Sequence, residues 1–300
     1  MTYWLVSNPN AGDHGCGRDF WLSHLAGAGI REPRCCRFED PDWQEELGAD
    51  DVLMVAGGDG SVNRGAHLCL QTGATLAILP SGTANDFARN LDLPESPDRL
   101  CQLIAEGKSL QVDVADFGQG IYLNVAHVGV GTLPALEAGK AEKRLLGRFS
   151  YGMNLLRRVN ARRGFRARIR CDQGVVSGRW LSVAVANGAF FGGGSEIPES
   201  SADDGCLSVV AVKPRPLIEL LVTFVLVQLG RQSPRRASTL VHLKGRHCVI
   251  ETGKPKTVTA DGEIIGKTPL AVTSRPASLV VIGRGIIAAG AEAQLSGRRQ

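Results

Sequence analysis

The stretch Asp51-Val52-Leu53-Met54-Val55-Ala56-Gly57-Gly58-Asp59-Gly60-Ser61 decides the fold of this chain. Residues 51–56 form a nearly continuous apolar run, which predicts a strand buried on both faces, as in a parallel sheet. The glycine-rich turn at residues 57–61 ends that strand, and we expect a helix from about Val62 to Gln71. A strand, a turn and a helix in this order are the repeating unit of α/β folds.

The same unit recurs on both sides of this stretch. We expect further strands at Tyr3–Ser7, Cys35–Phe38 and Thr75–Leu79, and helices at Phe20–Leu25, Asn85–Asn90 and Pro97–Glu106. Because strands and helices alternate at this spacing, the first half is predicted to be a doubly wound parallel sheet with helices on both faces.

Three loops have the same layout, in which a strand leads through a turn into a helix. They are residues 8–12, 57–61 and 81–86. In open parallel sheets ligands bind beyond the carboxyl ends of the strands, where glycines and helix N-termini offer backbone N–H groups to phosphate. A carboxylate at Asp59 would repel phosphates unless a cation lay between them. The pattern therefore indicates a nucleotide bound with Mg²⁺.

The second half is dominated by short apolar or alternating segments. Strands are expected at residues 165–170, 175–177, 179–186, 207–212, 240–243, 247–251, 256–259 and 279–282. Many short strands with glycine-rich turns predict a β-sandwich. Residues 217–229 predict a helix without a clear polar face, which favours a buried helix over a lipid-contacting one. Residues 283–300 predict an alanine-rich helix.

Composition and charge restrict the class of protein further. The chain has 300 residues, of which 43% are hydrophobic and 21% charged, so it is globular and of a length for about two domains. The longest uncharged apolar run, Leu220–Gly230, has 11 residues, and a membrane-spanning helix needs about 20. The eight cysteines contain no C-x-x-C pair, and the N-terminus lacks a signal peptide pattern, which favours a cytoplasmic protein.

Charge is distributed unevenly along the chain. Residues 1–139 carry 8 Lys and Arg against 19 Asp and Glu, a net charge of −11, whereas residues 140–300 carry 26 against 11, a net charge of +15. The densest basic stretch, residues 140–170, has 11 Lys and Arg against Glu142 alone, interleaved with apolar residues. Such a stretch fits the surface of an anionic membrane or a solvated face. Nucleic acid is the least favoured partner because no stacking motif accompanies the charge.

Several common site motifs are absent. Gly262–Thr268 is one residue too short for a Walker A loop, and Gly15-Cys16-Gly17 lacks the third glycine of a dinucleotide-binding turn. The six histidines show no metal-ligand spacing, and no G-x-S-x-G elbow occurs, which disfavours a serine hydrolase.

Six motifs in order nevertheless resemble those of the diacylglycerol kinase catalytic domain family. They are the NPNAG at residues 8–12, the GGDGSVN at 57–63, the LPSGTANDFA at 79–88, the NG…GGG at 186–194, the DDGCL at 203–207 and the ADGE at 260–263. This family includes bacterial lipid kinases and sphingosine kinases, and it is related to NAD kinase and phosphofructokinase. The resemblance covers most of the chain.

The resemblance implies a fold, an activity and a set of site residues. It implies ATP- and Mg²⁺-dependent phosphoryl transfer to a lipid hydroxyl, with residues 1–123 and 283–300 as the nucleotide domain and 124–282 as the β-sandwich domain. The implied ATP-binding residues are Asn8, Pro9, Asn10, Ala11, Gly12, Arg37, Gly57, Gly58, Asp59, Gly60, Ser61, Val62, Asn63, Arg64, Thr83, Asn85 and Asp86. The implied catalytic residues are Asp59, Asp261 and Glu263. Ser201, Asp204 and Cys206 match a second Mg²⁺ site, in which Asp204 gives a carboxylate and Ser201 and Cys206 give backbone carbonyls.

Some residues depart from the family pattern and leave alternatives open. Ser61 replaces a threonine, Arg64 replaces a glutamate, and Arg37 lies where the family often has a threonine. Two alternatives therefore stay open: an NAD-kinase-like enzyme with a soluble acceptor, and a nucleotide-binding protein without turnover. The expected partners are ATP, a lipid with a free hydroxyl and, peripherally, an anionic membrane. A homodimer is left open.

Overall fold

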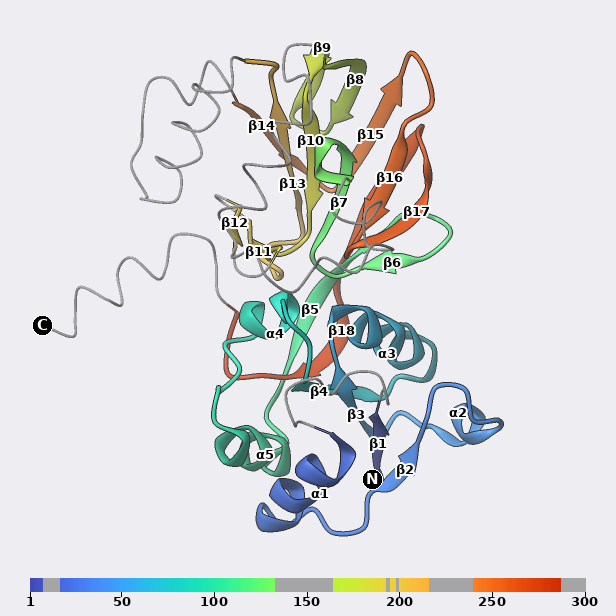
Figure 1. Ribbon diagram of the computed structural model, residues 1–300, viewed down its shortest axis with the longest axis vertical. Coiled ribbons are helices and arrows are strands. Elements are labelled where there is room, and N and C mark those ends of the chain that lie inside the picture. The colour runs from blue at the N-terminus through green and yellow to red at the C-terminus, as the bar shows by residue number, and fades with distance from the viewer. Residues whose placement is uncertain (8–16, 133–163, 193–194, 198–199, 216–239, 287–300) are drawn as a thin grey trace, which may run out of the picture.

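The computed structural model describes residues 1–7, 17–132, 164–192, 195–197, 200–215 and 240–286 of the chain. These residues form two lobes, one above the other in Figure 1. The first lobe holds the N-terminal α/β elements and the second is made mainly of strands.

A parallel sheet forms the centre of the first lobe. Its strands β1 (Tyr3–Ser7), β2 (Arg34–Cys36), β3 (Val52–Gly57) and β4 (Thr75–Pro80) lie in the order β2-β1-β3-β4. All six residues of β3 are buried: Leu53 and Val55 belong to the core on one face, and Val52 and Met54 to the core on the other. The continuous apolar run of β3 therefore supplies both cores, as predicted.

Helices cover both faces of this sheet. Helices α1 (Arg18–Gly27) and α5 (Pro97–Glu106) pack on one face, while α3 (Asp59–Thr72) and α4 (Asp86–Asn90) contribute to the core on the other. A short helix α2 (Trp43–Glu46) follows β2. The predicted doubly wound α/β arrangement is confirmed.

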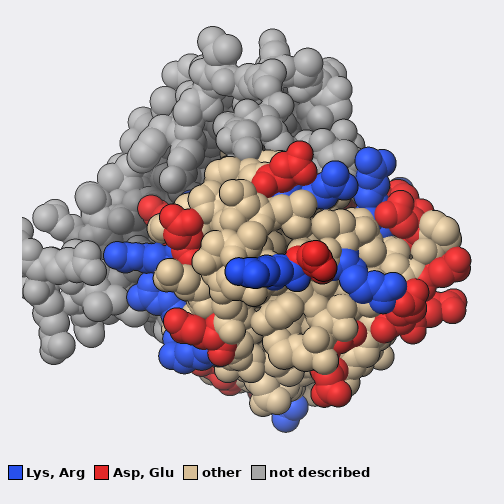
Figure 2. Space-filling model, turned by 90° about the horizontal axis from the view of Figure 1, so that it is seen from below, with Lys and Arg blue, Asp and Glu red and all other residues tan. Residues whose placement is uncertain are grey.

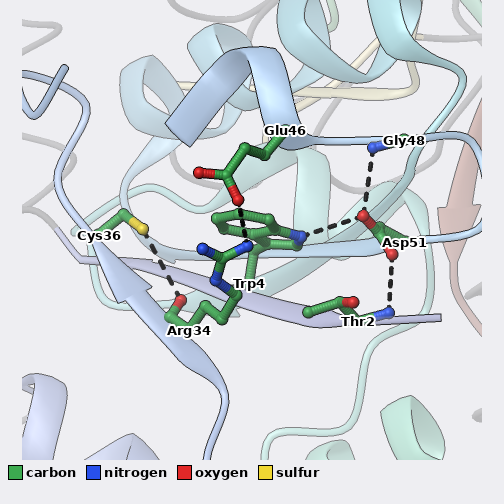
Figure 3. Close-up of polar contacts among 7 residues, drawn as sticks. All are labelled: Thr2, Trp4, Arg34, Cys36, Glu46, Gly48 and Asp51. Atoms are coloured by element: carbon green, nitrogen blue, oxygen red, sulfur yellow. Dashed lines mark hydrogen bonds and ion pairs between the residues drawn. The ribbon is translucent and has the colours of Figure 1, made fainter. Parts of the chain in front are cut away.

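A polar cluster around Asp51, which directly precedes β3, holds the amino end of that strand (Figure 3). Its carboxylate accepts hydrogen bonds from the backbone N–H of Thr2 at 2.7 Å and of Gly48 at 3.2 Å, and from the indole of Trp4 at 3.2 Å. Burial raises the pKa of Asp51, but these donors outweigh it and hold the pKa below its ordinary value. The Arg34 guanidinium lies 4.1 Å from the Trp4 ring centre. These contacts fix β1 and β2 beside β3.

The second lobe is a sandwich of two sheets. One sheet has the order β14-β13-β10-β7-β16-β17, and the other is the continuation β18-β15-β8-β9 of the first-lobe sheet. The core between them contains Val128, Ile169, Val185, Val209 and Ile250. The bounds of these strands are β7 Val125–Gly129, β8 Phe165–Cys171, β9 Gly174–Trp180, β10 Ser182–Ala186, β13 Leu207–Val212, β14 Leu240–Gly245, β15 His247–Thr252, β16 Thr257–Ala260 and β17 Glu263–Lys267.

Two long strands connect the lobes. Strand β5 (Ser109–Asp116) pairs antiparallel with β18 (Leu270–Ile282), and both contribute to the two cores. Leu270 and Val272 lie in the sandwich core, whereas Leu279 and Val281 lie in the core of the first lobe. The second lobe thus returns the chain to the first within β18. The predicted helix at 283–300 lies almost wholly outside the described residues.

Smaller elements complete the described part of the chain. They are β6 (Ile121–Tyr122), the 3₁₀ turn η1 (Val130–Thr132) and the hairpin of β11 (Phe190–Phe191) and β12 (Ser195–Glu196). Strands β5, β6, β7, β11, β12 and β17 and helix α2 were not predicted, and β18 was predicted only at residues 279–282. The predicted strand 179–186 divides at Leu181 into the end of β9 and β10. The predicted helix 217–229 and the basic residues 140–163 lie outside the described residues. Within the described ranges no helix is long and apolar enough to cross a membrane.

Candidate active site

Two of the three predicted phosphate loops lie against each other. A side-chain carbon on Gly82 would lie only 2.5 Å from the Cα of Gly58, so these two backbones approach as closely as glycine allows. The backbone N–H of Ser81 donates to the carbonyl of Gly57 at 3.0 Å. The loops after β3 and β4 therefore form one backbone surface at the carboxyl ends of the strands. The third loop, containing Asn8, Pro9, Asn10, Ala11 and Gly12, lies outside the described residues.

The loop after β4 is shaped by Asn85. Its side chain accepts a hydrogen bond from Gly82 N–H at 3.1 Å and donates to the Gly82 carbonyl at 2.8 Å. Asn85 adopts a positive φ of 49° and directly precedes α4. Thr83 is left exposed within this closed turn. Asn85 thus sets the loop conformation, and Thr83 is the accessible hydroxyl.

Asp59 is the first residue of α3 and faces the start of α4. Its Oδ1 accepts a hydrogen bond from the backbone N–H of Phe87 at 3.2 Å. Burial raises the pKa of Asp59 to about 6, and the neighbouring charges of Asp86 and Asp261 raise it as well. Three carboxylates near one another favour a cation. No group of three His, Cys, Asp or Glu in the described residues is arranged to hold a metal by itself, so Mg²⁺ would need oxygens from phosphate or water.

Asp261 joins the two lobes rather than projecting a free carboxylate. Its Oδ1 accepts the N–H groups of Asn124 at 3.0 Å and Val125 at 3.1 Å, and its Oδ2 accepts the N–H of Leu123 at 2.8 Å and the amide of Asn63 at 3.2 Å. Burial raises its pKa while these donors oppose the rise. Both oxygens already accept hydrogen bonds, so Asp261 is suited to holding Asn63 and the backbone of residues 123–125 in position.

Glu263, in contrast, is exposed and lies beside the glycine-rich loop. Its Oε1 is 3.2 Å from the position that a side-chain carbon on Gly60 would occupy. Glu263 begins β17 of the second lobe, and Gly60 lies in the first turn of α3. A cavity of about 170 Å³ adjoins this junction and is lined by Asn63, His67, Phe117 and Glu263 among others. An accessible carboxylate therefore meets the loop at a small cavity.

The remaining predicted residues of the glycine-rich motif have different positions. Gly57 is buried at the end of β3, Ser61 is half-buried, and Val62 packs in the core beneath the loop. Asn63 also donates to the carbonyl of Ile121 at 3.2 Å. The backbone of the loop, rather than the side chain of Val62, is therefore what a ligand could contact.

The two arginines that depart from the family pattern have structural contacts. Arg64 pairs with Glu39 at 2.9 Å, donates to the carbonyl of Phe38 at 3.0 Å and lies 4.5 Å from the Phe38 ring centre. The backbone N–H of Arg37 donates to Asp40 at 2.7 Å, and its carbonyl accepts from Trp43. Arg64 therefore fastens α3 to the segment after β2, at the edge of the predicted nucleotide site.

The predicted second metal site has protein partners for its polar side chains. One Asp204 oxygen pairs with Lys244 Nζ at 2.8 Å, and the other accepts the N–H of Cys206 at 2.8 Å. The hydroxyl of Ser201 donates to Asp203. The turn is also held by Asp113, which accepts the N–H of Gly205 at 2.6 Å. A metal here would have to displace Lys244 from Asp204, the one side chain assigned to this site, and the second metal site stays a prediction.

Sequence reasoning missed two residues of the junction cavity and one residue of the Asp204 turn. His67 and Phe117 line the cavity, and Lys244 neutralises Asp204. His67 follows Asn63 by four residues on α3 and so shares its face, a spacing that could have indicated it. Phe117 directly follows β5 and Lys244 lies in β14, and no local pattern marks either residue.

Comparison with known proteins identifies both parts of the chain. Residues 3–117 match the diacylglycerol kinase catalytic domain, and residues 125–283 match the YegS C-terminal NAD kinase beta sandwich-like domain. A "Probable lipid kinase YegS-like" of Xanthomonas euvesicatoria is 32% identical over 75% of this chain and 78% of its own length. An uncharacterized protein of Synechocystis is 28% identical over 81% of this chain, and the match spans 57% of that longer relative.

Solved structures have the same fold. A Bacillus anthracis crystal structure, 26% identical, superposes with a TM-score of 0.79 over 95% of this chain and 98% of its own. A second structure from that organism, a diacylglycerol kinase that is 24% identical, has a TM-score of 0.71 over 94% and 97%. With both domains matched in order and the glycine-rich loop facing Glu263, this chain belongs to the YegS-like lipid kinase family, whose catalytic domain is that of diacylglycerol kinases.

Proposed function

We propose that this protein transfers the γ-phosphoryl group of ATP, with Mg²⁺, to the free hydroxyl of a lipid such as diacylglycerol. The observation that carries the proposal is the meeting of Glu263, from the second lobe, with Gly60 of the glycine-rich loop. A donor site on one lobe and an accessible carboxylate on the other are the two halves that phosphoryl transfer to a hydroxyl requires.

The nucleotide would lie on the paired loops of the first lobe. Gly58 and Gly82 have no side chain that would keep phosphate away from the loop backbone, and the N-terminus of α3 adds partial positive charge. Asp59 would hold Mg²⁺ through water or phosphate oxygens, since burial beside Asp86 and Asp261 makes a cation favourable there. Mg²⁺ supplies neutralisation of the phosphate charge when it is bound.

Glu263 is the residue best placed to accept the proton of the acceptor hydroxyl. It is exposed, whereas both oxygens of Asp261 are used by the Leu123–Val125 backbone and Asn63. We therefore assign Asp261 the role of positioning the junction. General base catalysis contributes about 10²- to 10⁴-fold, and alignment of the two substrates contributes much of the remainder.

Transfer from labelled ATP to diacylglycerol, phosphatidylglycerol, sphingosine and NAD tests this proposal. Labelling of a lipid that requires Mg²⁺ and is lost in Glu263→Gln supports it. Labelling of NAD alone would favour the NAD-kinase-like alternative. ATP binding without any transfer would favour a nucleotide-binding protein. A Glu106→Gln variant, which alters an exposed carboxylate at the end of α5, is the matched control.

A further inference from the structure

One outer face of the second lobe carries a row of arginines. Along β8 the side chains alternate: Ala167 and Ile169 enter the sandwich core, and Arg166, Arg168 and Arg170 are exposed on the opposite face. Arg179 of β9 lies directly across from Arg166 in the antiparallel register, so it shares that face. We call these four residues the arginine face.

Basic residues outnumber acidic ones among the described residues of this face. Glu251 of β15 lies opposite Arg168 and pairs with Arg170 at 3.0 Å. Of the described residues that line the groove on this face, Glu251 is the only acidic one, beside Arg166, Arg168 and Arg179. Arg166 and Arg179 lie directly opposite each other in the register, so two basic residues stand side by side on this face.

The shape of the face suits a broad partner rather than a small ligand. An open groove of about 580 Å³ runs between Arg166, Arg168 and Arg179, with Ser177 and Gly178 on the same strand as Arg179. Val175, which lies opposite Arg170, is 53% exposed and adds an apolar side chain to the surface. Guanidinium groups beside an exposed apolar residue match a layer of phosphate headgroups over acyl chains.

The first half of the chain has the opposite charge. Residues 1–139 have a net charge of −11. On the lower face shown in Figure 2, acidic and basic side chains are interspersed, and acidic ones gather along the right-hand margin. An anionic partner would therefore approach the second lobe. Strand β8 also directly follows the basic stretch that starts at residue 140.

We propose that the arginine face docks the protein on the anionic headgroups of a membrane. This inference rests on the proposed function, because a lipid acceptor is held in a membrane. Each arginine near an anionic leaflet strengthens binding about fivefold, so loss of three should weaken it about 100-fold at low salt. The effect should decline as salt rises, since the attraction is screened over about 8 Å at physiological ionic strength.

The test compares two triple variants in vesicle sedimentation. Arg166→Gln, Arg168→Gln and Arg179→Gln together remove charge from the face and leave the Arg170–Glu251 pair in place. The matched control, Arg31→Gln, Arg99→Gln and Lys108→Gln, removes the same charge from exposed positions of the first lobe. Vesicles of phosphatidylcholine with phosphatidylglycerol are the probe, and pure phosphatidylcholine vesicles are the reference.

The wild type and the control should bind the anionic vesicles, while the face variant should bind about 100-fold more weakly with an unchanged melting temperature. Equal binding by wild type and face variant would overturn the proposal. Binding of wild type to duplex RNA or DNA but not to anionic vesicles would overturn it too. With a water-soluble short-chain diacylglycerol, the face variant should retain wild-type activity. A wild type that binds vesicles through this face but phosphorylates no acceptor would refute the proposed function alone.

Discussion

Asp261→Asn should destabilise the junction between the lobes as well as abolish activity. The carboxylate accepts four hydrogen bonds, two on each oxygen, from Asn63 and the backbone of Leu123, Asn124 and Val125. An asparagine presents an NH₂ group to two of these donors and leaves them without an acceptor. An unsatisfied donor costs about 1–3 kcal/mol, and relief of the buried charge offsets part of that. We expect a net loss of about 3 kcal/mol.

This loss is measurable as a shift in thermal unfolding followed by circular dichroism. For a protein of this size it corresponds to a fall in Tm of about 6–12 °C. Glu263→Gln is the matched variant, because it changes an exposed carboxylate two residues away, and its Tm should stay within about 1 °C of wild type. An Asp261→Asn protein that has the Tm of wild type but no kinase activity would refute the positioning role. It would indicate instead that Asp261 takes part directly in catalysis.

The remaining predictions concern a carboxylate, a cation and a histidine. Asp59→Asn should abolish phosphoryl transfer. The Tm should not change, because the buried Asp59 carboxylate stabilises no described ion pair. Activity within a few-fold of wild type would exclude the metal role. Lys244→Met should increase the rise in Tm that Mg²⁺ causes, because it frees Asp204 for a cation; equal Mg²⁺ responses in wild type and Asp204→Ala would rule out a metal in that turn. Burial lowers the pKa of His127 to about 4 from 6.5, so the unfolded chain binds the proton first. As pH falls from about 6.5 to about 4, the free energy of unfolding of wild type should decrease by up to about 3 kcal/mol relative to that of His127→Phe. Urea unfolding measures this difference, and parallel pH profiles of the two proteins would contradict the prediction.

Local patterns in the sequence predicted strands β1 to β4 and helices α1, α3, α4 and α5 of the first lobe. The apolar run of β3 is buried on both faces because its residues are uniformly apolar, and the glycines after it mark the loop that meets Gly82. The motifs also indicated Glu263 and Asp59, since each lies in a short stretch of characteristic residues. These features depend on neighbours in the chain, and a single sequence contains them.

Only the tertiary structure decided how the two lobes are joined and which carboxylate is free. Asp261 and Glu263 are two residues apart, and the sequence could not tell the clamped carboxylate from the exposed one, because the donors to Asp261 come from Asn63 and Leu123, 198 and 138 residues away. Strand β18 enters both cores for the same reason: its partners, β15, β5 and β4, are distant in the chain. The pairing of Arg64 with Glu39 likewise forms only when α3 packs beside the segment after β2. Contacts between distant residues are set by packing, which no local spacing records.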